Sequence, residues 1–285
     1  MKRVACLLAL LLCLTGCARA EFSYPGMFLR EGEPAQHTET GYRSQDVAIE
    51  ITFRRVEQTD VTVADIYLRE VTSFQRAFGG GAWGTQAYKV EELAVQSEAI
   101  LAMTGDNGHL LASGWLIGNG RVLRDTVSAK RDVCLLYRTG EMRTLLAQEV
   151  DPDWLRAEAE KVWQAFCFGP ALLDAEGRAL ADFNSDVNPV NPRSVIGYYE
   201  PGHYCFVQVD GRKTDSALER GKTNAGLTLE QLAALMENLG CQSAYNLDGG
   251  QSSLMWFDGH VISTPYKGGR RVGDIVLITE SLPLW

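Results

Sequence analysis

The chain has 285 residues, of which 46% are hydrophobic, and it carries a formal net charge of −9. A chain of this length and composition can bury the core of one large domain or of two small ones. The negative charge argues against nucleic acid as a partner and against a polybasic attachment to anionic lipids, but it does not exclude a local cationic pocket for an anionic substrate.

The N-terminal sequence MKRVACLLALLLCLTGCARA has the pattern of an export signal. Two basic residues precede an apolar stretch that is shorter than the ~20 residues of a membrane-spanning helix. The segment LTGC, which ends at Cys17, resembles the bacterial lipobox, in which the cysteine becomes the lipidated first residue of the mature protein. We expect a signal peptide over residues 1–16 and an extracytoplasmic protein that is lipid-anchored to the bacterial cell membrane through Cys17. The alternative is an ordinary secretory signal in which Cys17 is incidental.

Strand patterns dominate the next part of the chain. Residues 17–46 are polar and contain prolines and glycines, which predicts a tether and an irregular connecting segment before a folded domain over residues 47–285. The segments 47–56 and 61–71 alternate apolar and polar residues, as half-buried strands do. A short helix is expected near residues 90–102, followed by short strands separated by Gly-containing turns.

Two helices are predicted in the second half. DPDWLRAEAEKVWQAF, residues 151–166, begins with an Asp N-cap and a proline at the first helical position. TLEQLAALMENLG, residues 228–240, has a capping box formed by Thr228 and Gln231 and a glycine at its end. Hairpins are expected around residues 200–203 and at Asp258-Gly259. The fold class predicted is α+β, a single mixed domain rich in antiparallel strands with two or three helices.

Four cysteines remain beyond the export signal: Cys134, Cys167, Cys205 and Cys241. An even number in an oxidising compartment allows up to two disulfides in three connectivities. The alternative is that they are buried free thiols, since Cys134 and Cys205 lie inside apolar runs. Their spacing does not favour a structural zinc site.

Polar residues follow several predicted strands and are candidates for a working site. Asp248 lies where a short strand runs into Gly249-Gly250, and glycines allow a ligand to approach the backbone closely. The alternative is a simple turn in which Asp248 bonds its own backbone. Similar positions are occupied by Asp106, by Arg193, and by Asp210 with Arg212, whose guanidinium suits phosphate or carboxylate.

The order of these elements resembles the phosphodiester glycosidase family, which includes the enzyme that removes N-acetylglucosamine from a phosphodiester on mannose-bearing glycans. The shared elements are AMTGDNG (102–108), PRSVIG (192–197), VDGR (209–212), the helix over 226–241, NLDGGQSS (246–253) and GGRRVGDIVLI (268–278). The chain departs from the family's pattern at Thr104, at Asn224-Ala225 and at Gln251, and these departures concern the substrate pocket more than the fold.

The resemblance implies a hydrolase that cleaves a sugar-1-phosphodiester linkage, such as N-acetylglucosamine-1-phosphodiester. The export signal predicts that the substrate is an envelope or extracellular glycan. Phosphate is a good leaving group, so the reaction needs a carboxylate at the sugar carbon and cations at the phosphate more than a general acid. Asp248 is the first candidate for the carboxylate, and Asp106 and Asp210 are the next. Arg193 and Arg212 are expected to bind phosphate; Asn246 and Ser252 are expected to bind sugar hydroxyls beside Gly249 and Gly250.

Another class of function is also compatible with the sequence. A lipid-anchored, acidic, β-rich domain of the same fold can bind surface glycans without cleaving them. No catalytic metal or cofactor is expected, although Asp and Asn side chains at neighbouring strand ends can collect a structural calcium ion. Convergence of Asp106, Asp248 and an arginine on one cleft would favour the enzyme.

Overall fold

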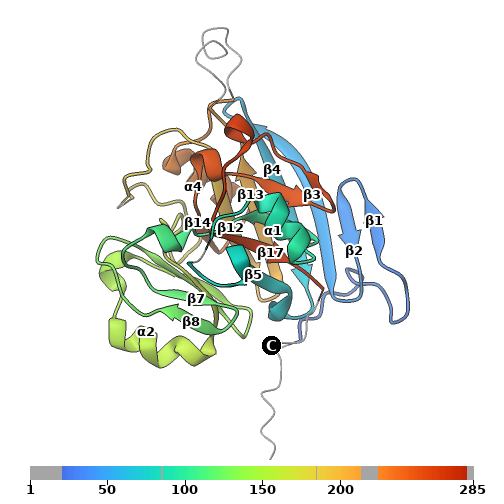
Figure 1. Ribbon diagram of the computed structural model, residues 1–285, viewed down its shortest axis with the longest axis horizontal. Coiled ribbons are helices and arrows are strands. Elements are labelled where there is room, and N and C mark those ends of the chain that lie inside the picture. Colours follow the sequence, from blue (N-terminus) through green and yellow to red (C-terminus); the bar gives the residue numbers. More distant parts are fainter. Residues whose placement is uncertain (1–20, 85, 184, 213–223, 281–285) are drawn as a thin grey trace, which may run out of the picture.

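The computed structural model describes residues 21–84, 86–183, 185–212 and 224–280, and the predicted signal peptide and Cys17 lie outside these ranges. In these ranges three antiparallel sheets form a single mixed domain, as predicted, and three α-helices pack on them (Figure 1). The helices are α1 (Val90–Gln96), α2 (Pro152–Glu158) and α4 (Leu229–Asn238). Within the described ranges, no helix has the length and apolar character needed to cross a membrane.

The largest sheet has seven strands in the order β1-β2-β3-β4-β13-β12-β14. Their bounds are β1 (Gln36–Thr38), β2 (Gly41–Arg43), β3 (Val47–Val56), β4 (Thr59–Leu68), β13 (His203–Val209), β12 (Arg193–Glu200) and β14 (Ser243–Asn246). The apolar face of α4 covers one side of this sheet, where Leu232 and Met236 pack on Val195 and Val207. The other side faces the two smaller sheets across the main core.

The two smaller sheets have five strands each. One has the order β10-β9-β11-β7-β8 and the other β16-β15-β6-β17-β5. The bounds are β10 (Met142–Leu145), β9 (Val133–Tyr137), β11 (Val162–Phe166), β7 (Leu116–Gly118), β8 (Arg121–Arg124), β16 (His260–Val261), β15 (Met255–Phe257), β6 (Leu101–Thr104), β17 (Asp274–Ile278) and β5 (Phe74–Phe78). α2 packs on the first through Leu155, and α1 packs on the second through Leu93.

The predicted helix over residues 151–166 is wrong in its second half. The N-cap is correct, since the Asp151 side chain accepts from the backbone N–H groups of Asp153 and Trp154. However, α2 ends at Glu158, and residues 162–166 form β11, the central strand of its sheet. All five side chains of β11 are buried, on both faces of the strand. A strand buried on both faces has apolar residues at successive positions, and in this segment those positions also fit one face of a helix.

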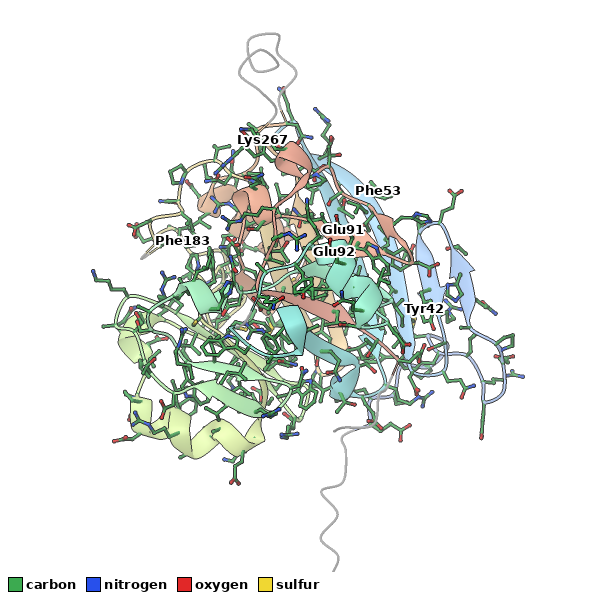
Figure 2. All side chains as sticks on the ribbon, viewed as in Figure 1. Tyr42, Phe53, Glu91, Glu92, Phe183 and Lys267 are labelled. Carbon is green, nitrogen blue, oxygen red and sulfur yellow. The ribbon has the colours of Figure 1, made fainter. Side chains whose placement is uncertain are left out.

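Part of the segment predicted as a tether and irregular connection joins the fold. Residues 36–38 and 41–43 form the β1–β2 hairpin at the edge of the large sheet (Figure 1). Tyr42, labelled in Figure 2, is 7% exposed, and Phe22 also packs into the main core. The folded unit therefore begins well before residue 47.

The capping box predicted for α4 is present, and it gives a direct test of that helix. The Thr228 hydroxyl accepts from the backbone N–H of Gln231, whose side chain accepts in turn from the backbone N–H of Thr228.

We expect Thr228→Ala to lower the free energy of unfolding by about 1 kcal/mol because one end of this box is lost. Urea unfolding followed by circular dichroism measures this free energy of unfolding. Glu237→Ala, at an exposed position of the same helix, is the control and should differ from the parent by under ~0.5 kcal/mol; an equal loss in both variants would contradict the assignment.

Candidate active site

Asp248 lies where three loops meet, one after a strand of the large sheet and two beside the neighbouring strands β6 and β17 of a smaller sheet. Its own loop follows β14, and its backbone N–H donates to the carbonyl of Gly105 in the loop after β6 at 3.1 Å. The third loop contains the short helix η7 (Tyr266–Gly268) and leads into β17. The Asp248 side chain is 8% exposed, so it is nearly enclosed by these loops.

The Asp248 carboxylate is surrounded by hydrogen-bond donors. Its Oδ2 accepts from Asn107 Nδ2 at 2.8 Å, from Ser252 Oγ at 2.6 Å and from Arg270 Nη2 at 2.9 Å. Its Oδ1 accepts only from the backbone N–H of Gly249, at 2.9 Å, among the described residues. A carboxylate has about four lone-pair positions, two on each oxygen. Oδ1 is therefore the oxygen with capacity left for an incoming group.

Arg270 and Ser252, which both contact this carboxylate, are also hydrogen-bonded to each other. Arg270 Nε donates to Ser252 Oγ at 2.5 Å while its Nη2 holds Asp248, so one guanidinium contacts both side chains. The Arg270 side chain is 44% exposed, and its outer edge faces solvent beside a buried anion. Ser252 is fully buried at the end of the short helix η6 (Gly250–Ser252). The arrangement pairs a half-exposed cation with a nearly enclosed carboxylate.

Asn107 is held in place by a buried ionic cluster. Its backbone is left-handed, with φ 48°, a conformation that Asn tolerates better than most residues. Asp274 Oδ1 accepts from the backbone N–H of Asn107 at 2.7 Å, and Asp274 Oδ2 accepts from Arg76 Nε at 2.7 Å. Arg76 also contacts Asp106 Oδ2 at 3.4 Å. The cluster of Arg76, Asp106 and Asp274 thus fixes the loop that carries Asn107.

Asp106 belongs to this cluster, in which it contacts Arg76. Its side chain is fully buried and accepts from the backbone N–H groups of Cys167 and Phe168, at 3.0 and 2.6 Å. Burial raises the pKa of Asp106, and the neighbouring Arg76 opposes that shift. The structure therefore places Asp106 beneath the site as a supporting carboxylate, with Asn107 as its link to Asp248.

The glycines after Asp248 allow the loops to approach closely. A Cβ on Gly249 would lie 2.6 Å from the carbonyl oxygen of Pro192, a distance that real Cβ atoms do not show. Gly250 has φ 64° and donates its N–H to the same carbonyl at 3.0 Å. These two residues let the Asp248 loop lie directly against the start of β12.

The two arginines predicted to bind phosphate differ in their surroundings. Arg193 is 2% exposed and donates to the carbonyls of Leu227 and Pro189, at 3.0 and 2.6 Å. Burial, with the nearby charge of Arg212, lowers the pKa of Arg193 to about 10. Arg212 is exposed, bonds the side chain of Asn191 and lies over the ring of Tyr266 at 5.5 Å. Arg212 therefore remains a candidate for an anion, whereas Arg193 holds the scaffold.

Asp210 and Asn246 support the loops around the site. Both carboxylate oxygens of Asp210 accept from the backbone N–H of Thr264 at 3.0 Å, which anchors the start of the η7 loop. Asn246 is 1% exposed and donates to the carbonyl of Gly169 at 2.7 Å. Its Oδ1 is buried without a hydrogen-bond partner in the described structure. Such a buried acceptor is suited to a bound water.

The structure adds Asn107 and Arg270 to the residues predicted from the sequence. Both lie in segments singled out there, TGDNG and GGRRVGD, but neither was given a role. The glycine pair before Arg270 signals a loop, yet nothing local indicates that this loop folds back onto Asp248.

The sequence left open a structural calcium ion bound by Asp and Asn side chains at neighbouring strand ends. In the portion of the chain that the structure covers, no group of three or more His, Cys, Asp or Glu side chains is arranged to hold a metal ion. The carboxylates near the site are bonded to Arg76, Arg270 and backbone N–H groups.

Comparisons with known proteins agree with this fold. The chain is 29% identical over 184 residues to the SPbeta prophage-derived uncharacterized protein YomE of Bacillus subtilis (strain 168), an alignment that covers 59% of this chain and 27% of that protein. The chain thus spans about a quarter of that relative's length.

Two solved structures share the architecture at low sequence identity. One is the catalytic domain of the zebrafish N-acetylglucosamine-1-phosphodiester alpha-N-acetylglucosaminidase, auto-inhibited by its pro-peptide, with a TM-score of 0.64, 17% identity, and coverage of 88% of this chain and 85% of that one. The other is a hypothetical protein from Synechocystis, with a TM-score of 0.62, 12% identity, and coverage of 87% and 64%. The sequence profile described as phosphodiester glycosidase matches residues 91–279, more than half of the chain and all the loops that meet at Asp248. The chain therefore belongs to the phosphodiester glycosidase family.

Proposed function

We propose that this protein is a hydrolase that cleaves a sugar-1-phosphodiester bond. The observation that carries the proposal is the convergence of Asp248 with Arg270 on strand-end loops, one a nearly enclosed carboxylate and the other a half-exposed cation at 2.9 Å. Bonds between an anomeric carbon and a phosphate need both kinds of group, and membership of the family supports the same reaction.

Asp248 acts at the sugar carbon in this proposal. Its Oδ1 accepts one backbone N–H, from Gly249, so it has a lone pair for attack on the anomeric carbon or for removing a proton from an attacking water. Either route breaks the bond between that carbon and the phosphate oxygen, and the oxygen leaves with the phosphate. Water supplies the hydroxyl that ends on the sugar.

Arg270 and Arg212 act on the phosphate. The charge that develops on the leaving oxygen is stabilised by a preorganised cation without a proton transfer. Arg270 is fixed by Asp248 and Ser252, and Arg212 lies over Tyr266 next to Gly250. Lys267, labelled in Figure 2, follows Tyr266 on the same loop and adds positive charge there. The leaving group is a phosphate monoester, and one whose other substituent carries further negative charge would suit these cations.

Location and substrate complete the proposal. The N-terminal pattern supports export and lipid attachment at Cys17, which would place the enzyme at the outer face of the cell membrane with an envelope or extracellular glycan as substrate. The zebrafish protein of similar fold is named for N-acetylglucosamine-1-phosphodiester, so this sugar is the first to test.

The test is release of free sugar from a panel of sugar-1-phosphodiesters, beginning with N-acetylglucosamine-1-phosphodiesters. We expect the parent protein to release reducing sugar. Glycan binding measured by calorimetry on the same panel, without any release, would overturn the enzyme and favour a non-catalytic glycan-binding domain of the same fold.

Arg270→Ala is expected to lower kcat/KM on a cleaved substrate by about 10²–10³-fold, because it removes the cation that lies 2.9 Å from the reacting carboxylate. Arg271→Ala is the matched control, since the neighbouring Arg271 pairs with Glu92 at 3.4 Å and donates to the carbonyl of Ala87, away from Asp248. The control should stay within a few-fold of the parent. Equal activity in both variants would remove Arg270 from the reaction.

A further inference from the structure

Two of the cysteines lie in contact beneath α4. Cys205 is on β13, and Cys241 follows the end of α4, where its backbone N–H donates to the carbonyl of Met236 at 3.2 Å. Their Sγ atoms are 3.7 Å apart, and the side chains are 0% and 1% exposed. Both belong to the core between α4 and the large sheet, so the pair joins two elements that are distant along the chain.

The neighbouring strand leaves room for both sulfur atoms. Gly197 on β12 is the register partner of Cys205. A Cβ at Gly197 would lie 2.6 Å from the Sγ of Cys205 and 2.8 Å from the Sγ of Cys241, closer than real Cβ atoms approach. The absence of a side chain at this position therefore creates the space in which the two sulfurs meet.

The other two cysteines face different surroundings. Cys134 on β9 is the register partner of Phe166, the residue before Cys167. Successive side chains of an extended segment point to opposite faces, which separates Cys134 from Cys167. The Cys167 Sγ lies 3.5 Å from Asp106 Oδ2 and 3.4 Å from Arg124 Nη2.

We propose that Cys205 and Cys241 form a disulfide when the chain folds in the presence of a disulfide-containing oxidant, while Cys134 and Cys167 remain thiols. One cysteine thiolate attacks the oxidant's disulfide and displaces one of its thiols. The second thiolate then attacks the resulting mixed disulfide and displaces the other thiol. The two cysteines lose two electrons and two protons, and the oxidant's disulfide is reduced to two thiols.

The bond forms before α4 closes over the sheet. The adjacent Cys241 thiol, together with burial, raises the pKa of Cys205 well above its ordinary value, so little reactive thiolate exists in the folded protein. Oxidation during folding avoids this barrier, because both sulfurs are then accessible. Once formed, the bond fastens the end of α4 to β13.

Peptide mapping of the full chain tests the proposal. The chain is unfolded with a denaturant and a reductant, refolded with reduced and oxidised glutathione, alkylated in denaturant and digested without reduction. Mass spectrometry should find the peptide containing Cys205 linked to the one containing Cys241, with Cys134 and Cys167 alkylated. Alkylation of Cys205 and Cys241 in the refolded protein, or their linkage to other cysteines, would overturn the proposal.

Thermal unfolding provides a second measurement. The bond closes a loop of roughly 36 residues, so refolding with the oxidant should raise Tm by on the order of 10 °C over refolding with reductant alone. Cys205→Ala and Cys241→Ala should each lose this gain, and Cys134→Ala should keep it. An oxidant-dependent rise in Tm that persists in Cys205→Ala or Cys241→Ala would also overturn the proposal. If these two variants fail to fold, the peptide mapping of the parent protein decides.

Discussion

Asp248→Asn is expected to lower turnover of a sugar-1-phosphodiester by roughly 10²–10⁴-fold, the range typical of a lost proton-transferring or attacking carboxylate. The substitution keeps the shape of the side chain but removes its negative charge. The new amide N–H₂ takes the place of one carboxylate oxygen. It therefore faces a hydrogen-bond donor, either the backbone N–H of Gly249 or the donors that contact Oδ2. This mismatch should lower the free energy of unfolding by about 1–2 kcal/mol. Turnover and urea unfolding are measured on the same preparation.

Asp258→Asn is the matched control for this experiment. Asp258 lies in the β15–β16 turn with φ 42°, a conformation that Asn also tolerates, and its side chain is 40% exposed. This variant should keep the activity of the parent. Full turnover by a folded Asp248→Asn protein would exclude Asp248 from the reaction and leave a structural role in joining the three loops.

Chemical rescue distinguishes a chemical role of Asp248 from a structural one. In Asp248→Ala the site loses the carboxylate and gains space for a small anion. If the carboxylate attacks the sugar or activates water, added formate or azide should restore part of the lost turnover, in proportion to its concentration. A purely structural loss would not respond to these anions.

Arg76→Met is expected to have the largest effect on stability, lowering the free energy of unfolding by about 3–5 kcal/mol. Arg76 is fully buried, and it is the cation that faces both Asp274 and Asp106. Methionine has a similar length but leaves two buried carboxylates without the charge that balances them. Arg143→Met is the control, because the exposed pair of Arg143 with Glu141 should contribute less than ~1 kcal/mol.

The loss in Arg76→Met should depend on pH in a defined direction. Burial holds the pKa of Asp106 above its ordinary value, and the loss of Arg76 removes the charge that lowers it. A carboxyl whose pKa is higher in the folded than in the unfolded state contributes less stability as pH rises through that window. Because the pKa of Asp106 is already raised in the parent, the difference between variant and parent should be smallest near pH 4 and should grow only as pH rises above the parent's Asp106 pKa, as measured by urea unfolding at each pH up to about pH 7. A constant difference would contradict the buried charge as the cause.

The same variant tests whether the buried ionic cluster supports the site. Asp274, the partner of Arg76, holds the backbone of Asn107, which in turn donates to Asp248. A folded Arg76→Met protein should therefore also lose activity through displacement of Asn107.

Much of the local structure was determined by the sequence alone. The turn at Asp258-Gly259, the hairpin around residues 200–203 and the capping box of Thr228 depend on backbone conformation and on neighbours a few residues away, and all three are present. The position of Asp248 at a strand end before two glycines is likewise a local property. These features follow from side-chain periodicity and turn chemistry, which any short segment carries with it.

The tertiary structure decided the features that depend on distant partners. Residues 162–166 form a strand because β9 and β7 pair with them on either side, although their apolar spacing also fits a helix. Asp106 and Asp248 follow similar short strands, yet packing buries the first against Arg76 and brings the second to Arg270. Arg270 approaches Asp248 because β17 pairs with β6 and the loop before it crosses the Asp248 loop. Such contacts join residues far apart in the chain, and their geometry is set by sheet pairing and core packing rather than by the local pattern.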